Sequence, residues 1–558
     1  MKRIFTALLL IGFVLSSCCT KENKDKYAYL YDNLPFDMPR LSVPTFPNNE
    51  VCITDFGGIG DGTHLNTEAF AKALTSLSEQ GGGKLIVPAG IWYTGPIVLR
   101  SNINLHLEDR AIILFSPDKD LYPLVETSFE GLDTRRCQSP IWGKDLTNIA
   151  ITGSGAIDGN GHFWRALRKE KVSESYWKKA TSQGGVFKSD DYWMPSAQFL
   201  HGDAISDMNV PRHFTTEEEW ASVRDFLRPV MVSLQNCKDI YLQGVIFQNS
   251  PAWNIHPWMS ENIIIDGVEV RNPSYAQNGD GLDIESCKNV IVVNSSFDVG
   301  DDGICIKSGK DEDGRKHGVA SENIIVDNCT VYKGHGGFVV GSEMSGGAKN
   351  IVVSNCQFLG TDVGLRFKSK RGRGGVVEKI YISNVSMIDI ATEPIHFNLY
   401  YGGRSAVEDL EDGVTVVHEE ELPAVDETTP TFRDIFIKNV YCSNARKAMY
   451  FYGLPEHNID NIQIEDVTIH ATFGAELRES ENIVLKNVNI YPEQGEAVVL
   501  GNVQNVQIEN LETNKDLSSV VSISGVNTEN VSLKTQYGKD KIKVSENLGE
   551  EQVKIETL

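Results

Sequence analysis

The chain has 558 residues and a net charge of −24, with 41% hydrophobic and 23% charged residues. The length exceeds what one compact core usually holds, so several domains or an elongated repeat architecture are expected. The composition is that of a folded protein and excludes disorder over most of the chain, while the acidic balance argues against nucleic acid as a partner.

The first residues have the pattern of an export signal. Lys2 and Arg3 precede an apolar run over residues 4–15, which is too short to cross a membrane comfortably. The stretch Leu15-Ser16-Ser17-Cys18 resembles a bacterial lipoprotein cleavage box. A plain secretory signal cut nearby is the alternative.

We therefore expect residues 1–17 to be a signal peptide, Cys18 to be lipidated and residues 18–45 to form a tether. The protein would be exported and held at a bacterial outer membrane, on its periplasmic or cell-surface face. Its contact with the membrane would come only through this lipid, because no other stretch is long and apolar enough to span a bilayer.

Short β-branched runs, usually led by Asn or Asp, recur along the rest of the chain. They begin at Asn148, Asp239, Asn262, Asn289, Asn323, Asn350, Lys379, Asp434, Asn461, Asn482, Asn505 and Asn530. Each run has strand length and β propensity. A repeat this short cannot bury its own apolar face, whereas stacked repeats can. The pattern predicts an all-β fold, a single-stranded right-handed parallel β-helix over residues 46–545.

Two segments depart from this repeat. Residues 68–80 are predicted to form a helix that caps the N-terminal end of the solenoid. Residues about 163–228 lack the strand pattern and predict a large, partly helical insertion that walls one end of a cleft. Residues 408–429 are acidic and predict a surface loop.

Eight cysteines follow Cys18 and Cys19, and they show neither a CxxC pair nor zinc spacing. Cys329 and Cys356 occupy the same place in the repeat, which favours stacked, buried thiols. No metal and no cofactor are expected.

Three aspartates lie about one coil apart in two glycine-flanked segments. Asp280 belongs to Asn278-Gly279-Asp280, and Asp301-Asp302 follow Gly300. Neighbouring coils would bring them together, and crowded carboxyl groups raise one another's pKa, so that one stays protonated while another is ionised. Glycoside hydrolysis needs such an acid and base. Solvated acidic turns are the alternative explanation.

The next two coils carry further candidates. Gly334-His335-Gly336 comes one coil after the aspartates, and Arg366-Phe367-Lys368 one coil later. Arg366 and Lys368 are two residues apart and therefore share one face of a strand. Arg binds a carboxylate through a bidentate fork and Lys as a point charge, which suits an acidic sugar.

These four motifs, in this order, resemble glycoside hydrolase family 28, the polygalacturonase family. The resemblance extends over residues 51–392, although Gly279 and Phe367 replace the threonine and isoleucine usual in that family. It implies an inverting hydrolase without a metal, in which Asp301 is the general acid. It also implies that Asp280 and Asp302 deprotonate the attacking water and that His335 sets the protonation of the acid. Arg366, Lys368 and Asn278 would contact the substrate.

Three further residues are candidates for substrate binding. Lys307 begins a set of cations near the motifs that continues with Lys370, Arg371 and Arg373, and it would help to make the cleft positive. Trp253 and His256 lie one coil before Asp280. Trp253 could stack on a sugar ring, and packing in the core is the equal alternative for both.

Ile306-Lys307-Ser308-Gly309 and residues 341–347 resemble the exo-acting bacterial branch of the family. The expected activity is release of galacturonic acid from a pectic polysaccharide or oligosaccharide. An endo-polygalacturonase, a rhamnogalacturonan hydrolase, a pectate lyase and a non-catalytic glycan-binding lipoprotein are the alternatives.

Overall fold

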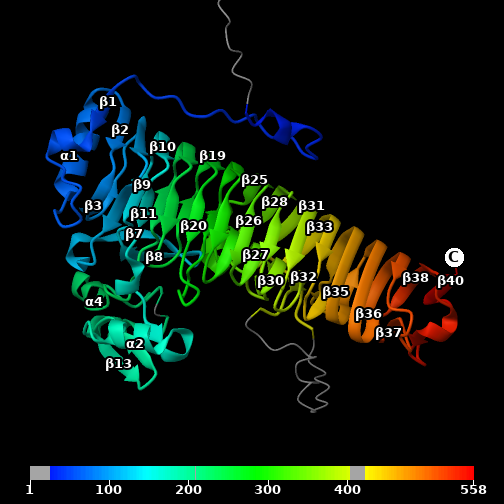
Figure 1. The fold of residues 1–558 in the computed structure, drawn as a ribbon. Coiled ribbons are helices and arrows are strands. Elements are labelled where there is room, and N and C mark those ends of the chain that lie inside the picture. Colours follow the sequence, from blue (N-terminus) through cyan, green and yellow to red (C-terminus); the bar gives the residue numbers. More distant parts are fainter. Residues whose placement is uncertain (1–25, 208, 402–421, 558) are drawn as a thin grey trace, which may run out of the picture.

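The computed structural model describes residues 26–207, 209–401 and 422–557, which form an elongated stack of β-coils (Figure 1). Cys18 and the expected signal peptide lie outside the described residues, as does most of the expected acidic loop. The described residues contain no helix long and apolar enough to cross a membrane.

Each central coil contributes three short strands. One coil consists of β21 (Leu282–Glu285), β22 (Lys288–Val293) and β23 (Ser296–Asp298), and the next begins with β24 (Asp302–Lys307). Strands in the same position of successive coils pair in parallel, as in β21 with β24 and β22 with β25 (Ser321–Asp327). The protein is a right-handed parallel β-helix, as the sequence predicts.

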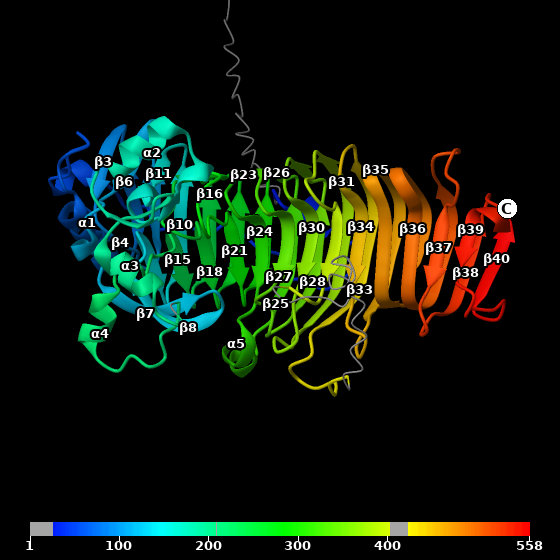
Figure 2. The ribbon, with the colours of Figure 1, turned by 90° about the horizontal axis from the view of Figure 1, so that it is seen from below.

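We call the sheet that contains β21 and β24 the first sheet and the sheet that contains β22 and β25 the second sheet. The first sheet also contains β9 (Ile141–Lys144), β15 (Val232–Gln235), β18 (Ile255–Trp258), β27 (Gly336–Gly341), β30 (Val363–Lys368), β32 (Ile395–Asn398) and β34 (Lys447–Tyr452). Its strands lie side by side in Figure 2, which views the molecule from below. The second sheet also contains β16 (Lys238–Gln243), β19 (Glu261–Asp266) and β28 (Ala348–Ser354).

The asparagines that lead the repeats have a structural function at the start of the second sheet. Asn262, Asn289, Asn323 and Asn350 all adopt positive φ, a conformation that Asn tolerates better than most residues. Each donates its side-chain amide to the corresponding residue of the preceding coil at 2.9–3.1 Å. These hydrogen bonds align each coil with the previous one.

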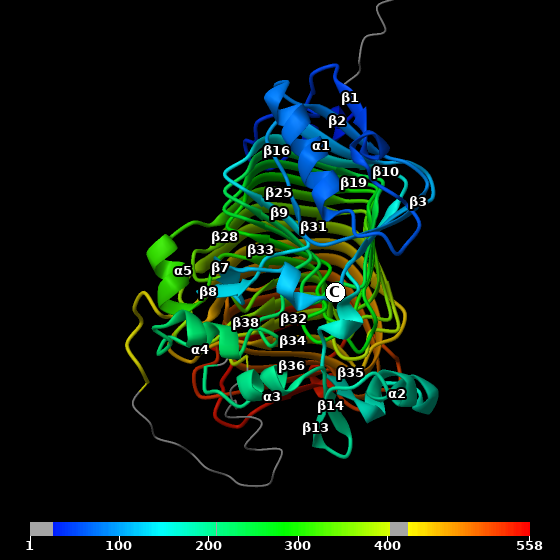
Figure 3. The same cartoon turned by 90° about the vertical axis from the view of Figure 1, so that its left-hand side faces the viewer.

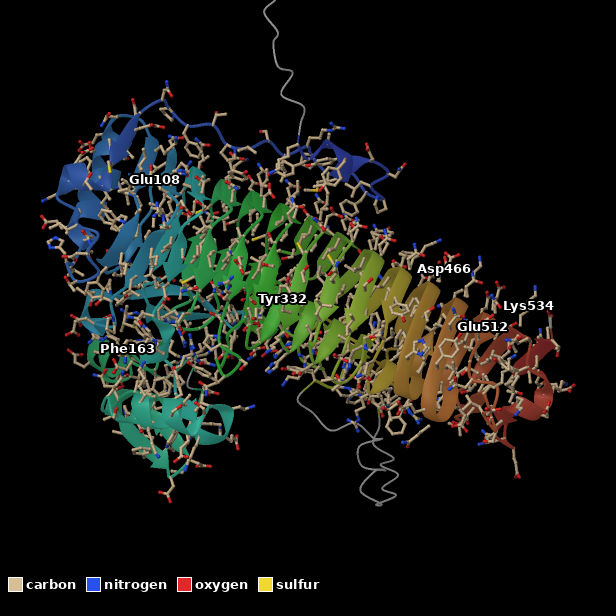
Figure 4. All side chains as sticks on the ribbon, in the orientation of Figure 1. Glu108, Phe163, Tyr332, Asp466, Glu512 and Lys534 are labelled. Atoms are coloured by element: carbon tan, nitrogen blue, oxygen red, sulfur yellow. The ribbon has the colours of Figure 1, made fainter. Side chains whose placement is uncertain are left out.

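The coils enclose one continuous hydrophobic core, in which residues such as Ile284, Ile306 and Phe367 are fully buried. Cys329 and Cys356 are buried free thiols, and all eight described cysteines are free. Charged side chains such as Asp466 and Lys534 lie along the outside of the coils (Figure 4).

The N-terminal end of the stack is covered by α1 (Thr67–Glu79), whose Phe70, Leu74 and Leu77 are buried against the first coils (Figure 3). This helix confirms the prediction for residues 68–80. At the other end the stack continues beyond the predicted limit of residue 545, because β40 (Val553–Thr557) pairs in parallel with β38 (Glu529–Thr535).

The prediction of a tether over residues 18–45 is wrong for its described part. Residues 26–41, which include η1 (Ala28–Tyr31), run along the second sheet (Figure 1). Tyr27, Leu30 and Leu41 pack in one cluster with outward-facing residues of that sheet, namely Ile264, Ile291, Val293 and Ile325. The Tyr27 hydroxyl also donates to Asp266 at 2.8 Å. We call residues 26–41 the strap.

Residues 163–228 form the partly helical insertion that the sequence predicts. It contains α2 (Glu174–Thr181), α3 (Ala197–Asp203), α4 (Glu217–Ser222) and a small antiparallel sheet of β12 (Leu167–Arg168), β13 (Val186–Ser189) and β14 (Tyr192–Met194). Sequence reasoning missed a second excursion, the antiparallel hairpin of β7 (Leu124–Phe129) and β8 (Leu132–Cys137).

Candidate active site

The three predicted aspartates meet on the outer surface of the first sheet. Carboxylate oxygens of Asp280, Asp301 and Asp302 all lie within 4.8 Å of one another. Asp302 begins β24, and Asp280 lies two residues before β21, the adjacent strand of the preceding coil. We call these residues the acid trio.

Asp301 and Asp302 both face outward although they are consecutive. Asp301 precedes the strand and accepts the backbone N–H of Asp302 at 3.0 Å. Gly303 takes the inward position, where an added Cβ would lie 2.7 Å from Val331. The next residue, Ile304, also lies in the core, so the alternation of the strand is interrupted at Gly303. This interruption allows Asp302 to reach the same outer surface as Asp301.

Asp302 is buried between two cations. The Lys368 ammonium lies 2.7 Å from one carboxylate oxygen, and Arg366 Nη1 lies 3.3 Å from the other. Burial opposes ionisation of Asp302, but the charges of Lys368 and Arg366 outweigh it and hold its pKa below the usual value. This carboxylate is therefore ionised at neutral pH and can accept a proton.

His335 contacts Asp301 from the next coil. Its Nδ1 lies 3.1 Å from the Asp301 carboxylate, and its backbone N–H donates to the Asp301 carbonyl at 2.9 Å. The hydrogen bond to Asp301 raises the pKa of His335, so the imidazolium form is favoured beside this acid. Asp301 is the most exposed of the trio, with 23% of its side chain accessible.

Asp280 has the opposite electrostatic environment to Asp302. Burial and the charges of Asp301 and Asp283 raise its pKa well above the usual value, and Lys307 only partly offsets them. The trio thus combines an ionised carboxylate with one that tends to hold a proton.

Lys307 is buried beside the trio, to the same degree as Asp280 and Asp302, and its predicted role in substrate binding stays a prediction. Its buried ammonium is 3.1 Å from Asp283, 3.5 Å from Asp280 and 3.6 Å from Glu343. These acids raise its pKa despite burial, and Lys307 compensates their charge.

Sequence reasoning missed two buried acids beside the trio. Asp283 and Glu285 alternate with inward-facing Leu282 and Ile284 on β21, so the alternation places both acids on the outer face. Nothing in that alternation shows that they are fully buried. The covering hairpin, in which Ser128 donates to Glu285 at 3.5 Å, contributes to this burial.

Trp253 and His256 are also buried, which contradicts their predicted contact with substrate. The Trp253 ring is 1% exposed, stacks on Phe129 of the hairpin at 5.1 Å and lies 3.8 Å from the Lys307 ammonium. His256 Nε2 lies 2.7 Å from Glu285. Both residues belong to the packing between the hairpin and the first sheet.

Asn278 connects the trio to the insertion and, through it, to the hairpin. It adopts positive φ, and its side-chain oxygen accepts from Arg228 at 3.1 Å. Arg228 ends the insertion, and its carbonyl accepts from Arg136 of the hairpin at 3.0 Å. Arg136 and Arg228 are buried guanidinium groups on this side of the trio that sequence reasoning missed.

The basic run after Lys368 does not face the aspartates as predicted. Arg371 pairs with Glu456 at 2.7 Å, and Arg373 pairs with Asp311 and donates to the Ser342 carbonyl at 3.2 Å. Both side chains bind neighbouring loops because the chain turns away after β30.

The trio has the spacing of a carboxylate cation site. However, Lys307, Arg366 and Lys368 already neutralise these acids at close range. A divalent cation would have to bind beside three positive charges, so the donor set does not suit a resident metal.

An arrangement of an ionised carboxylate, a carboxyl group that tends to keep its proton and an arginine–lysine pair on a β-helix defines a glycoside hydrolase. The comparisons agree with this class. The model of the family "Glycosyl hydrolases family 28" matches residues 221–420.

Three similar proteins illustrate the relationship. A probable polygalacturonase of Vitis vinifera is 29% identical over 75% of this chain and 74% of its own. An exo-poly-alpha-D-galacturonosidase of Dickeya chrysanthemi is 28% identical over 70% of this chain and 61% of its own. The crystal structure of a hyperthermoactive exopolygalacturonase from Thermotoga maritima is 33% identical, covers 85% of this chain and 94% of its own, and has a TM-score of 0.64. The chain belongs to family 28 of the glycosyl hydrolases.

Proposed function

We propose that the protein is an inverting exo-polygalacturonase that releases galacturonic acid from the end of a pectic chain. The observation that carries this proposal is the position of the acid trio beside Arg366 and Lys368. The Arg366 side chain is 18% accessible, so part of its guanidinium group can contact a substrate carboxylate.

The proposed reaction assigns each acid a separate step. Ionised Asp302, with Asp280, orients a water molecule and accepts its proton as the oxygen attacks the anomeric carbon. Three carboxyl groups this close cannot all ionise readily, so the trio retains a proton. The proton that Asp280 tends to hold passes to Asp301, because carboxylate oxygens of the two residues lie within 4.8 Å of each other. Asp301, which reaches solvent and is positioned by His335, delivers this proton to the glycosidic oxygen as the bond to the anomeric carbon breaks. Asp280, now ionised, can then act with Asp302 on the attacking water.

Inversion is supported by the family and not by the spacing alone. Inverting enzymes typically separate their acid and base by about 6.5–9.5 Å. The limit of 4.8 Å within the trio is measured between the nearest oxygens and does not give the separation of the carboxyl groups across a bound sugar.

Exo action is supported by the hairpin of β7 and β8 and by the insertion of residues 163–228, which both lie on one side of the trio. The hairpin stacks on Trp253, one coil before the trio, and its Gly131 carbonyl accepts from the backbone N–H of Lys310, just after β24, at 2.7 Å. The hairpin therefore extends from the coil before the trio to the end of the strand that carries Asp302. The insertion packs beside it through Arg228. Such a wall would admit only a chain end, and exo-acting enzymes are among the relatives.

The test is the reaction of purified protein with polygalacturonan and defined oligogalacturonides, followed by chromatography and proton NMR. We expect monomer from the first time points and a product of inverted anomeric configuration. An early ladder of sizes would indicate an endo-acting enzyme, and retained configuration would contradict the mechanism.

Asp301→Asn should lower kcat by about 10²–10⁴-fold at an unchanged melting temperature, because it removes the proton donor. The exposed Asp516→Asn is the matched control and should retain full activity. If Asp301→Asn binds pectic oligosaccharides and wild type does not hydrolyse them, the non-catalytic glycan-binding function is correct.

We also propose that the protein is an exported lipoprotein acylated at Cys18. The support is the basic start, the apolar run and the cysteine box at residues 15–18. Wild type should enter the detergent phase on extraction, and Cys18→Ser should remain in the aqueous phase. Equal partitioning of both would contradict the anchor.

A further inference from the structure

A cavity of about 450 Å³ lies on the first sheet, beyond the arginine–lysine pair, and no step of the proposed reaction uses it. It is lined by residues before β32, from β34, from β35 (Ile459–Glu481) and from β36 (Val484–Glu512). Its lining residues are Glu393, Arg446, Lys447, Tyr450, Phe473, Gly474, Ala475, Glu476, Gln494, Gly495, Glu496 and Val499. We call it the distal cavity.

The pairing of the strands aligns this cavity with the active site. Arg366 pairs with His396, which pairs with Tyr450, and the same row continues through Glu476 to Val499. Tyr450, Glu476 and Val499 all line the cavity. Because paired strands lie about 4.8 Å apart, the cavity begins roughly 5–10 Å from Arg366 along the stack. It is therefore a direct continuation of the surface that carries Arg366.

Each acid of the cavity already has a cationic or imidazole partner. Glu393 lies 2.9 Å from His396, and Glu496 lies 2.7 Å from Lys543. Glu476 is held by Lys447 at 2.5 Å and by Arg478 at 2.7 Å. The negative charges of the cavity are thus compensated within the protein.

Arg446 differs from these groups. Its backbone is fixed by hydrogen bonds to Thr392 and Phe473, and its side chain is exposed. No carboxylate lies within ion-pair distance of it among the described residues. The uncompensated charge on the cavity wall is therefore a guanidinium group, which binds carboxylates.

Phe473 lines the same cavity as Arg446, and its side chain is 38% exposed. It pairs with Lys447 across β34 and β35. An exposed aromatic ring and an unpaired arginine in one cavity offer a sugar acid an apolar surface for its ring and a partner for its carboxylate.

We propose that the distal cavity is a binding subsite for a further acidic sugar unit of the substrate chain, recognised by Arg446 and Phe473. This inference rests on the proposed function, because it assumes that the chain is cut at the acid trio. With the other side of the trio walled by the hairpin and the insertion, the uncut part of the chain extends over β32 and β34 into this cavity.

The test compares kinetics on oligogalacturonides of increasing length. In wild type, KM should fall once the oligomer is long enough to reach the cavity. In Arg446→Gln, KM for the long oligomers should rise about tenfold, as expected for loss of one charge-assisted hydrogen bond. Both kcat and the KM of the shortest hydrolysed oligomer should stay unchanged. Phe473→Ala should have the same length-specific effect, and Arg446→Lys should restore part of the affinity.

Lys438→Gln is the matched control, because it removes one positive charge from β33 (Thr431–Cys442), away from the cavity. It should leave the length dependence intact. Equal KM increases for short and long oligomers, or no change in Arg446→Gln on long oligomers, would overturn the subsite. Failure of wild type to hydrolyse any oligogalacturonide would instead overturn the proposed function.

Discussion

The same coils bury outward-facing side chains of opposite character on two sheets. On the first sheet, Asp283, Glu285 and Lys307 are buried beside the acid trio, and the hairpin contacts Glu285. On the second sheet, Ile264 and Ile291 are buried beneath the strap. In both places a segment from elsewhere in the chain covers a strand surface that would otherwise face water.

The difference shows what each cover contributes. The strap stabilises the fold by removing apolar surface from water, and this effect does not depend on the exact geometry of the contacts. The cover on the first sheet places charges in a poorly solvated environment, where they shift one another's pKa values. Burial of charged side chains, as on the first sheet, is unfavourable unless every charge is compensated. It also shifts pKa values and so produces groups that can exchange protons.

The largest effect on stability should follow from removing the central cation of the first sheet. Lys307→Met leaves Asp280, Asp283 and Glu343 without their shared partner. We expect a loss of about 3–5 kcal/mol in the free energy of unfolding at pH 7, measured by urea denaturation. Lys438→Met, at an exposed ion pair, should change it by less than about 0.5 kcal/mol. Equal losses in both variants would show that the buried charges are not coupled.

The buried charges of the first sheet should also make the free energy of unfolding depend on pH. Burial raises the pKa of Asp283 to about 6, although Lys307 opposes this shift. The folded protein therefore binds more protons than the unfolded chain between about pH 4 and 6, so stability falls as pH rises through that range. Relative to Asp283→Asn, wild type should lose up to about 3 kcal/mol between pH 4 and 7. Urea unfolding at several pH values measures this, and parallel curves for the two proteins would contradict it.

The smallest effect on the free energy of unfolding should come from the apolar cluster between the strap and the second sheet. Leu30→Ala removes part of the cluster beneath the strap, and we expect a loss of about 1–2 kcal/mol, because this site lies at the edge of the fold. Unlike the effect at Asp283, this loss should be the same at pH 4 and 7. Val526→Ala, at a side chain that is 84% exposed, is the control and should have no effect. A pH-dependent loss in Leu30→Ala would contradict the distinction between the two surfaces.

The sequence predicted the β-helix because its signals are local. An Asn or Asp followed by a β-branched run can be recognised within a few residues of sequence, and this signal recurs along the stack. In the structure these asparagines adopt positive φ. The meeting of Asp280, Asp301, His335 and Arg366 was predictable for the same reason, since one coil of chain returns to the same face of the stack.

Burial by distant segments was not predictable in this way. Trp253 and His256 have the residue types and spacing of substrate contacts, but Phe129 of the hairpin and Glu285 contact them and both side chains are buried. The sequence of the strap predicts a tether, because its docking depends on distant apolar residues of β19, β22 and β25 that face outward. Alternation along a strand indicates the face of a residue but not what covers that face.

The acid trio lies well inside the stack, with coils on both sides of β21, β24 and β27 (Figure 2). In a solenoid each coil is stabilised mainly by its two neighbours, so opening begins at the ends, where one neighbour is missing. Fraying of the terminal coils can therefore proceed for some distance before the geometry of the reaction centre changes. The outer coils protect catalysis without taking part in it.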